Sequence, residues 1–209
     1  YSTFANDGKL YSPVMITEIK DRDGLTRSDY TQTQRTTEAM REDVAYVVNH
    51  MLQGVAAPTG GLGYQPTAWR THEIERPRGG KTGTTNDSRD AWFSGFTADF
   101  TCIVWVGYAD NRPLGKGRDH DGQTFTGGHQ AAPIWIEFMK VAEEGLPVRD
   151  FDVPENIDFF NIDRVRGNLG GSYREAFIKG TSPPPQWYGD VHRAIQEVEE
   201  EEAQELESL

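Results

Sequence analysis

Residues 79–84 read Gly-Gly-Lys-Thr-Gly-Thr, and this stretch decides the fold together with two apolar stretches that come after it. These are Asp-Ala-Trp-Phe-Ser-Gly-Phe at 90–96 and Thr-Cys-Ile-Val-Trp-Val-Gly-Tyr at 101–108. The short connection at 97–100 is typical of an antiparallel hairpin. The sequence therefore predicts three adjacent antiparallel strands.

Helices are expected on both sides of these strands in the sequence. A helix is predicted over residues 42–54, because acidic residues occupy its first turn and Gly54 closes it. Its apolar stripe is expected to face the core, and consists of Val44, Val47, Val48, Met51 and Leu52. A second helix is predicted to open at Pro133 and to end near Gly145. The aromatic residues expected in the core of the sheet are Trp92, Phe93 and Trp105.

The first forty residues give weaker signals. Residues 1–10 are expected to be the end of a helix, stopped by Asn-Asp-Gly at 6–8. Residues 14–20 are rich in strand formers and lead into a tight turn at 21–24. Two long polar loops, 55–80 and 109–130, interrupt the rest of the chain. Loops of such length within a compact domain are often functional.

Composition and charge argue against nucleic acid as a partner. The 209 residues carry a formal net charge of −12. Seven Glu and no Lys or Arg follow Arg193, so the rest of the chain carries −5, an ordinary balance for a folded protein. No basic stripe is present to displace counterions from phosphates.

Cysteine and histidine usage predicts neither a metal site nor another cofactor. Cys102 is the only cysteine, so internal disulfides and thiolate metal cages are excluded. It lies in an apolar run, where a small buried residue is expected rather than a nucleophile. The five histidines lack metal-ligand spacing; they are His50, His72, His120, His129 and His192.

Gly80-Lys81-Thr82 also matches the end of a phosphate-binding loop. That motif needs a glycine five residues before Gly80, where this chain has Glu75. It also needs a helix directly after the loop, whereas two predicted strands come next here. A phosphate loop is therefore rejected.

Lys-Thr-Gly at the start of a hairpin is also a motif of penicillin-binding proteins and β-lactamases. The surrounding motifs give it specificity, and they occupy residues 51–55, 80–87, 90–93, 105–108, 126–128 and 131–135. In this order and spacing, the sequence resembles the C-terminal part of the transpeptidase domain of class A, bifunctional penicillin-binding proteins, from about Tyr1 to about Gly145. The resemblance implies an α/β (α+β) chain with an incomplete transpeptidase or serine β-lactamase-like fold, an antiparallel sheet with covering helices.

The resemblance also implies roles for the motif. Lys81 and Thr84 would be catalytic, and Thr82, Gly83 and Thr84 would bind substrate. The two threonine hydroxyls would hold the terminal carboxylate of a D-Ala-D-Ala stem peptide or a β-lactam. The Thr84 backbone N–H would be an oxyanion-hole donor, and Gly83 would let the ligand backbone approach. The alternative is an exposed strand with a solvated lysine.

The family's nucleophile motif is absent from these residues. The family acylates a serine in Ser-x-x-Lys and uses a second Ser-x-Asn motif, but none of the eight serines here fits either pattern. Both motifs are expected upstream of Tyr1, so the chain alone is predicted to be inactive. The sheet is expected to lack a helical partner layer and to expose an apolar face. The alternative function is a non-catalytic remnant or an interaction module.

Three segments are expected: 1–149 as part of the transpeptidase domain, 150–182 as an extension, and 183–209 as a proline linker with an acidic tail. No run of about 18 apolar residues marks a membrane span, and no signal peptide is seen. The expected partners are the peptidoglycan stem peptide, β-lactams and the upstream half of the same domain. The resemblance implies a membrane-anchored parent protein whose domain is periplasmic or at the extracytoplasmic face of the membrane.

Overall fold

The computed structural model describes residues 1–31, 34–58, 65–115, 122 and 124–183. The chain divides into two compact units, Tyr1–Ile157 and Asp158–Leu209. The expected segment boundaries at 149/150 and 182/183 stay a prediction, and most of the expected linker and tail at 183–209 lies outside the described residues.

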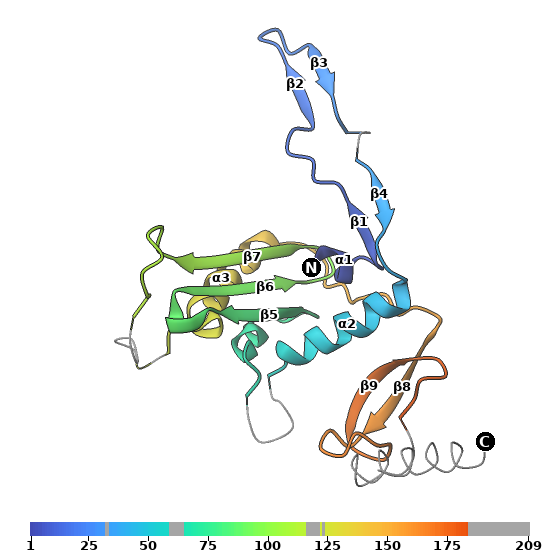
Figure 1. The fold of residues 1–209 in the computed structure, drawn as a ribbon. Helices are drawn as coiled ribbons and strands as arrows, with labels where there is room; N and C mark the ends of the chain where they lie inside the picture. The colour runs from blue at the N-terminus through green and yellow to red at the C-terminus, as the bar shows by residue number, and fades with distance from the viewer. Residues whose placement is uncertain (32–33, 59–64, 116–121, 123, 184–209) are drawn as a thin grey trace, which may run out of the picture. The chain divides into compact units, whose positions relative to one another are not determined.

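A three-stranded antiparallel sheet forms the centre of the first unit (Figure 1). Its strands are β5 (Gly79–Thr84), β6 (Asp90–Phe96) and β7 (Thr101–Gly107), in the order β5-β6-β7. The three strands predicted from the sequence are thus confirmed. β5 lies at one end of this order, so within the described residues one of its edges pairs with no other strand.

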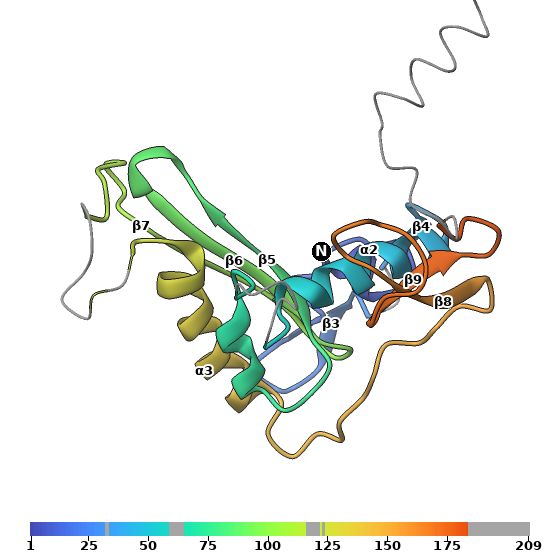
Figure 2. The ribbon, with the colours of Figure 1, turned by 90° about the horizontal axis from the view of Figure 1, so that it is seen from below.

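One face of the sheet is covered by α3 (Ala132–Ala142), as Figure 2 shows. A proline in the first turn of α3 has no backbone N–H to leave unsatisfied there. The ring of Phe93 meets that of Trp135 edge-on, with 5.2 Å between centroids, and both side chains are fully buried. Ile136 and Met139 belong to the same core. The predicted helix is confirmed.

The opposite face of the sheet is exposed. Trp92 is 41% exposed and Trp105 is 47% exposed, so their expected core positions are wrong, whereas that of Phe93 is right. Successive side chains of a strand point to opposite faces, and burying Phe93 against α3 turns Trp92 outward. Trp92 pairs across strands with Trp105, and Ile103 is exposed beside them. This is the apolar face that the sequence led us to expect.

Helix α2 (Glu42–Val55) forms where it was predicted, but its buried face differs. Val44 and Met51 are exposed, while Ala45, Tyr46 and Asn49 are buried. The helix packs against β5 and against α1 (Ser2–Ala5), and polar bonds take part in this packing. The Asn49 amide donates to the Phe4 carbonyl at 3.3 Å. The expected apolar seam is therefore only partly right: Val47, Val48 and Leu52 are half-buried, and side chains with polar partners occupy part of the covered face.

Two antiparallel ribbons come after α1. One pairs β1 (Lys9–Tyr11) with β4 (Thr36–Glu38), and the other pairs β2 (Glu18–Lys20) with β3 (Thr26–Asp29). The expected turn between β2 and β3 is confirmed, since the Asp21 carboxylate accepts the N–H groups of Asp23 and Leu25. The helix end and stop expected within residues 1–10 are also present, with Gly8 at φ +78°.

The second unit contains a hairpin that the sequence did not predict. Its strands are β8 (Ile157–Ile162), which starts at the last residue of the first unit, and β9 (Tyr173–Ile178). Phe160 and Phe177 contact each other across the hairpin at 5.9 Å between ring centroids.

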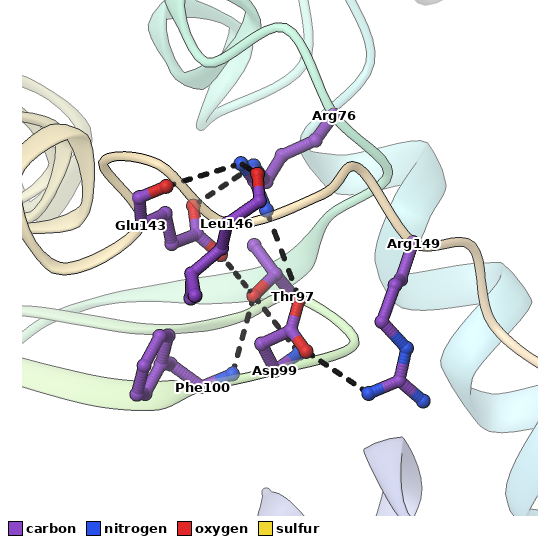
Figure 3. Close-up of polar contacts among 7 residues, drawn as sticks. All are labelled: Arg76, Thr97, Asp99, Phe100, Glu143, Leu146 and Arg149. Atoms are coloured by element: carbon purple, nitrogen blue, oxygen red, sulfur yellow. Dashed lines mark hydrogen bonds and ion pairs between the residues drawn. The ribbon is translucent and has the colours of Figure 1, made fainter.

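A buried ion-pair network fastens the end of α3 to the β6–β7 turn (Figure 3). Arg76 Nε lies 3.2 Å from Glu143 Oε2, and Arg76 Nη1 lies 3.7 Å from Asp99 Oδ2. The Thr97 hydroxyl donates to Glu143 Oε1 at 2.5 Å. Arg149 adds a 3.0 Å pair with Asp99 from a more exposed position. Because Arg76 lies just before β5, the network also anchors the entry to that strand.

We predict that Arg76→Met destabilises the fold by about 3–5 kcal/mol, because it removes the cationic partner of the buried Glu143 carboxylate. The matched control is Arg149→Met, which removes the exposed partner of the same Asp99 and is expected to cost less than about 1 kcal/mol. Urea unfolding measures both. Equal losses for the two variants would contradict the assignment of Arg76 as the buried anchor.

Asp43, at the start of α2, predicts a pH effect on stability. The hydrogen bond from Arg41 lowers the pKa of Asp43 from 3.8 to about 2, and Asn156 also donates to its carboxylate at 2.7 Å. A depressed pKa stabilises the fold above about pH 4, and this contribution is lost as the pH falls toward 2. Since Arg41 is exposed to solvent, we expect a screened contribution of about 1 kcal/mol.

Unfolding measured from pH 6 to pH 2 tests this expectation. Asp43→Asn is expected to be less stable at pH 6 and to have a flatter profile than the unmodified chain. Asp110→Asn, at an exposed ion pair with Arg112, is the control and should leave the profile unchanged. If the stability of Asp43→Asn fell with pH as steeply as that of the unmodified chain, the role of the Asp43 carboxylate would be contradicted.

Candidate functional site

A cavity of about 340 Å³ lies beside β5. Three segments far apart in the sequence line it. Thr82 and Thr84 come from β5. Thr67 and Trp69 come from the segment that enters the 3-10 helix η1 (Trp69–Glu73). The third group of lining residues lies just before or at the start of the π-helical turn η3 (Gly127–Ala131). That last group comprises Thr124, Thr126, Gly128 and His129.

Thr82 and Thr84 reach the same cavity because they alternate along β5. Thr82 pairs with Phe93 and Thr84 pairs with Ala91 on β6, and cross-strand partners share a face of the sheet. Phe93 and Ala91 are buried, so the two threonines lie on the α3 side, where η3 also packs. The structure thus brings these two predicted binding residues together.

Lys81 lies on the other face of the strand. It pairs with Ser94, its side chain is exposed, and its Nζ donates to the Thr82 carbonyl at 2.9 Å. Among the described residues that line the cavity, Lys81 is absent. The predicted catalytic lysine and the predicted binding hydroxyls therefore face opposite sides of β5.

Gly83 fits tightly within the sheet. A Cβ at this position would lie 3.2 Å from the Cβ of Trp92, which is closer than most side-chain contacts. Gly83 thus serves the packing of the sheet itself. Its expected role in admitting a ligand backbone stays a prediction, as does the oxyanion role of the Thr84 N–H.

The turn at 124–129 is a wall of the site that sequence reasoning missed. A Cβ on Gly127 would lie 2.1 Å from the Trp92 carbonyl oxygen, and one on Gly128 would lie 2.1 Å from that of Thr67. Two glycines therefore let the turn lie directly on the sheet and on the segment at 67. The Thr-Gly-Gly triplet at 126–128 could have indicated this close packing, because adjacent glycines allow a near approach of backbones.

Hydrogen bonds tie these walls to the two β5 threonines. The Gly127 backbone N–H donates to Thr84 Oγ1 at 3.1 Å, and the hydroxyls of Thr82 and Thr67 lie 2.9 Å apart. His129 Nδ1 lies 3.0 Å from the Thr124 hydroxyl and 3.1 Å from that of Thr126. The cavity is thus lined with ordered hydroxyl groups.

The long loop predicted at 55–80 contributes through its last residues. Arg78 fastens it, since its guanidinium donates to Thr71 Oγ1 at 3.2 Å and to the Ala56 carbonyl at 3.1 Å. Trp69 stacks on His72, with 5.5 Å between ring centroids. These contacts hold Thr67 and Trp69 at the cavity.

Other candidate sites are weaker. A hollow of about 670 Å³ is larger, but the charged groups that line it include the Arg41–Asp43 ion pair, and it lies away from the Lys-Thr-Gly motif. Burial raises the pKa of the Cys102 thiol, which favours its unreactive form. Within the described ranges, no group of three His, Cys, Asp or Glu residues could hold a metal ion.

Comparison with known proteins agrees with this geometry. The family model described as penicillin binding protein transpeptidase domain matches residues 1–140. Penicillin-binding protein 1A of Escherichia coli is 39% identical over 159 residues, covering 70% of this chain and 18% of that protein. Penicillin-binding protein 1A of Vibrio cholerae is 30% identical over 233 residues, covering 93% of this chain and 28% of that protein. The crystal structure of the Haemophilus influenzae penicillin-binding protein 1A matches with a TM-score of 0.74 at 30% identity, covering 87% of this chain and 31% of that one.

The chain belongs to the penicillin-binding protein transpeptidase domain family. Its similarity to several penicillin-binding proteins 1A supports the class A assignment and confirms the expected mixed α/β fold with antiparallel sheets. The chain spans 18% and 28% of the length of these two curated relatives.

We predict that Gly127→Ala destabilises the chain by about 2–3 kcal/mol, because the added methyl group meets the backbone of β6 and displaces η3. The control is Gly24→Ala in the β2–β3 turn, where a Cβ meets nothing within 4 Å and only the positive φ opposes it; that should cost about 1 kcal/mol. Thermal unfolding compares them. A smaller loss of stability in Gly127→Ala than in Gly24→Ala would contradict the close contact of Gly127 with the β6 backbone.

Proposed function

We propose that this chain is part of a D-Ala-D-Ala transpeptidase domain that cross-links peptidoglycan by serine acyl transfer. The observation that carries the proposal is the pair of threonine hydroxyls on an edge strand, Thr82 and Thr84, which converge in one cavity. Membership of the transpeptidase family supports it. The expected ligands are the peptidoglycan stem peptide and β-lactams.

The geometry suggests how a stem peptide would bind. An extended peptide can add to an unpaired sheet edge through main-chain hydrogen bonds, and the edge of β5 that pairs with no described strand offers such a place. The Thr82 and Thr84 hydroxyls would then donate to the terminal carboxylate. The Thr84 N–H would stabilise the oxyanion that develops on acylation, a contribution on the order of 3 kcal/mol.

Lys81 would act from the opposite face of β5. Its ammonium group would supply a positive field to the acylated serine and its proton shuttle. In this proposal the nucleophile belongs to an upstream half of the domain, on the side of the sheet where Lys81, Trp92 and Trp105 are exposed. That half would also cover this apolar face.

The proposed location is the extracytoplasmic side of the bacterial cytoplasmic membrane, since peptidoglycan is assembled there. Among the helices that the structure describes, none has the length and apolar character needed to cross a bilayer.

A non-catalytic remnant or interaction module is the second candidate, and the absence of Ser-x-x-Lys from the 209 residues favours it. Labelling with a fluorescent penicillin separates the two. We expect no covalent label on this chain alone, and efficient labelling once the chain is joined to an upstream segment that carries Ser-x-x-Lys. Failure of the joined protein to label would support the remnant.

In the joined protein, Thr84→Ala and Lys81→Ala are each expected to lower the acylation rate by at least about tenfold, because each removes a group that stabilises the reacting complex. Glu137→Ala, an exposed change on α3, is the control and should leave the rate unchanged. Stopped-flow acylation measures the effect. Normal rates in either site variant would remove the role proposed for that residue.

A further inference from the structure

The Thr84 backbone N–H points to the unpaired edge of β5. Thr85, the next residue, donates its N–H to the Asp90 carbonyl at 3.1 Å. Bonded and unbonded residue pairs alternate along an antiparallel ladder, so the neighbouring pair of Thr84 and Ala91 is an unbonded one. The N–H that is proposed to stabilise the oxyanion is therefore directed away from β6. Its position depends on how firmly the end of β5 is held.

The turn that follows β5 has a strained backbone. Asp87 and Ser88 have φ angles of +58° and +50°, and residues with a side chain rarely adopt this left-handed conformation, least of all two in succession. Such a conformation persists only where surrounding contacts fix it. The turn must therefore be held by contacts at its base.

The carboxylate of Asp90 supplies these contacts. Its Oδ2 accepts the Thr85 hydroxyl at 3.1 Å, and the Asp90 N–H donates back to Thr85 Oγ1 at 2.8 Å. Its Oδ1 accepts the indole N–H of Trp105 at 2.8 Å. Asp90 begins β6 and Trp105 belongs to β7. One carboxylate thus connects the end of β5 with both other strands of the sheet.

The chemistry of the three side chains fixes the direction of each bond. An indole N–H only donates, and an ionised carboxylate only accepts. The Thr85 hydroxyl receives the Asp90 N–H, so its single proton goes to the carboxylate. Hydrogen bonds to an ionised acceptor are stronger than those between neutral groups. An amide at position 90 has only one oxygen, so it could not accept both bonds in this geometry.

We propose that Asp90 is a positioning residue, which fixes the end of β5 and thereby aims the Thr84 backbone N–H at the reacting carbonyl oxygen. If the carboxylate released Thr85, the strained turn would relax and displace this N–H. An oxyanion donor acts on the charge that develops in the transition state, so its displacement slows acylation without weakening initial binding. This inference rests on the proposed transpeptidase function and deepens it.

The test uses the protein joined to an upstream segment that carries Ser-x-x-Lys. Acylation is followed by stopped flow over a range of penicillin concentrations, which separates the limiting acylation rate from the dissociation constant of the initial complex. Asp90→Asn is expected to lower the limiting rate about tenfold, since a misplacement of about 1 Å can cost about 100-fold. The dissociation constant should change by less than about twofold.

Two further variants separate positioning from folding. Thr85→Val removes the hydroxyl that binds Asp90 but keeps the shape, and should lower the limiting rate in the same way. Thr85→Ser keeps the hydroxyl and should keep the rate within about twofold of its original value. Should Asp90→Asn lose its fold in thermal unfolding, the two variants at position 85 carry the test.

A matched control makes the same change elsewhere. Asp23 is an exposed residue of the β2–β3 turn, and Asp23→Asn should alter neither the limiting rate nor the dissociation constant. In every variant the total label bound at completion gives the amount of active protein, so that rates refer to folded molecules only.

The outcomes separate this inference from the proposed function. A limiting rate that falls in Asp90→Asn and Thr85→Val and is kept in Thr85→Ser supports both. An unchanged limiting rate, or a change confined to the dissociation constant, overturns the positioning role while the transpeptidase function stands. If penicillin does not acylate the unmodified joined protein, the function fails and the inference with it.

Discussion

The contact of Phe93 with Trp135 is the constraint on which the rest of this structure depends. Both rings are fully buried where α3 crosses the sheet. Because successive side chains of a strand point to opposite faces of the sheet, burying Phe93 fixes the face on which each side chain of β6 lies. Strand pairing extends this constraint to β5. Thr82 and Thr84 therefore lie on the side of α3 and η3, while Lys81 and Trp92 lie on the open side.

This alternation divides the chemistry of the motif between two faces. The hydroxyl pair lies in a cavity whose other walls also belong to this chain, so the carboxylate binding that we propose would need no further protein. The lysine faces a surface with exposed Trp92, Ile103 and Trp105, which suits covering by further protein. Binding and nucleophilic attack would thus depend on different sides of one strand.

Glycine placement makes the cavity possible. Gly127 and Gly128 let a turn touch the backbone of β6 and of Thr67, which brings hydrogen-bond partners to both β5 threonines. The buried network of Arg76, Asp99 and Glu143 anchors the entry to β5 from the other end. The position of β5 is thus restrained at its start by charges and at its end by close backbone packing.

The sequence by itself determined the three strands, both main helices and the family motifs, because these depend on local spacing and on short-range turn chemistry. It did not determine which face of α2 is buried, since Asn49 is covered through a polar bond that no hydrophobic pattern reveals. Nor did it show that Thr67 and Gly127 meet the motif threonines, or that Trp92 and Trp105 face outward. Those features depend on contacts between residues far apart in the chain, and only packing of the tertiary structure decides them.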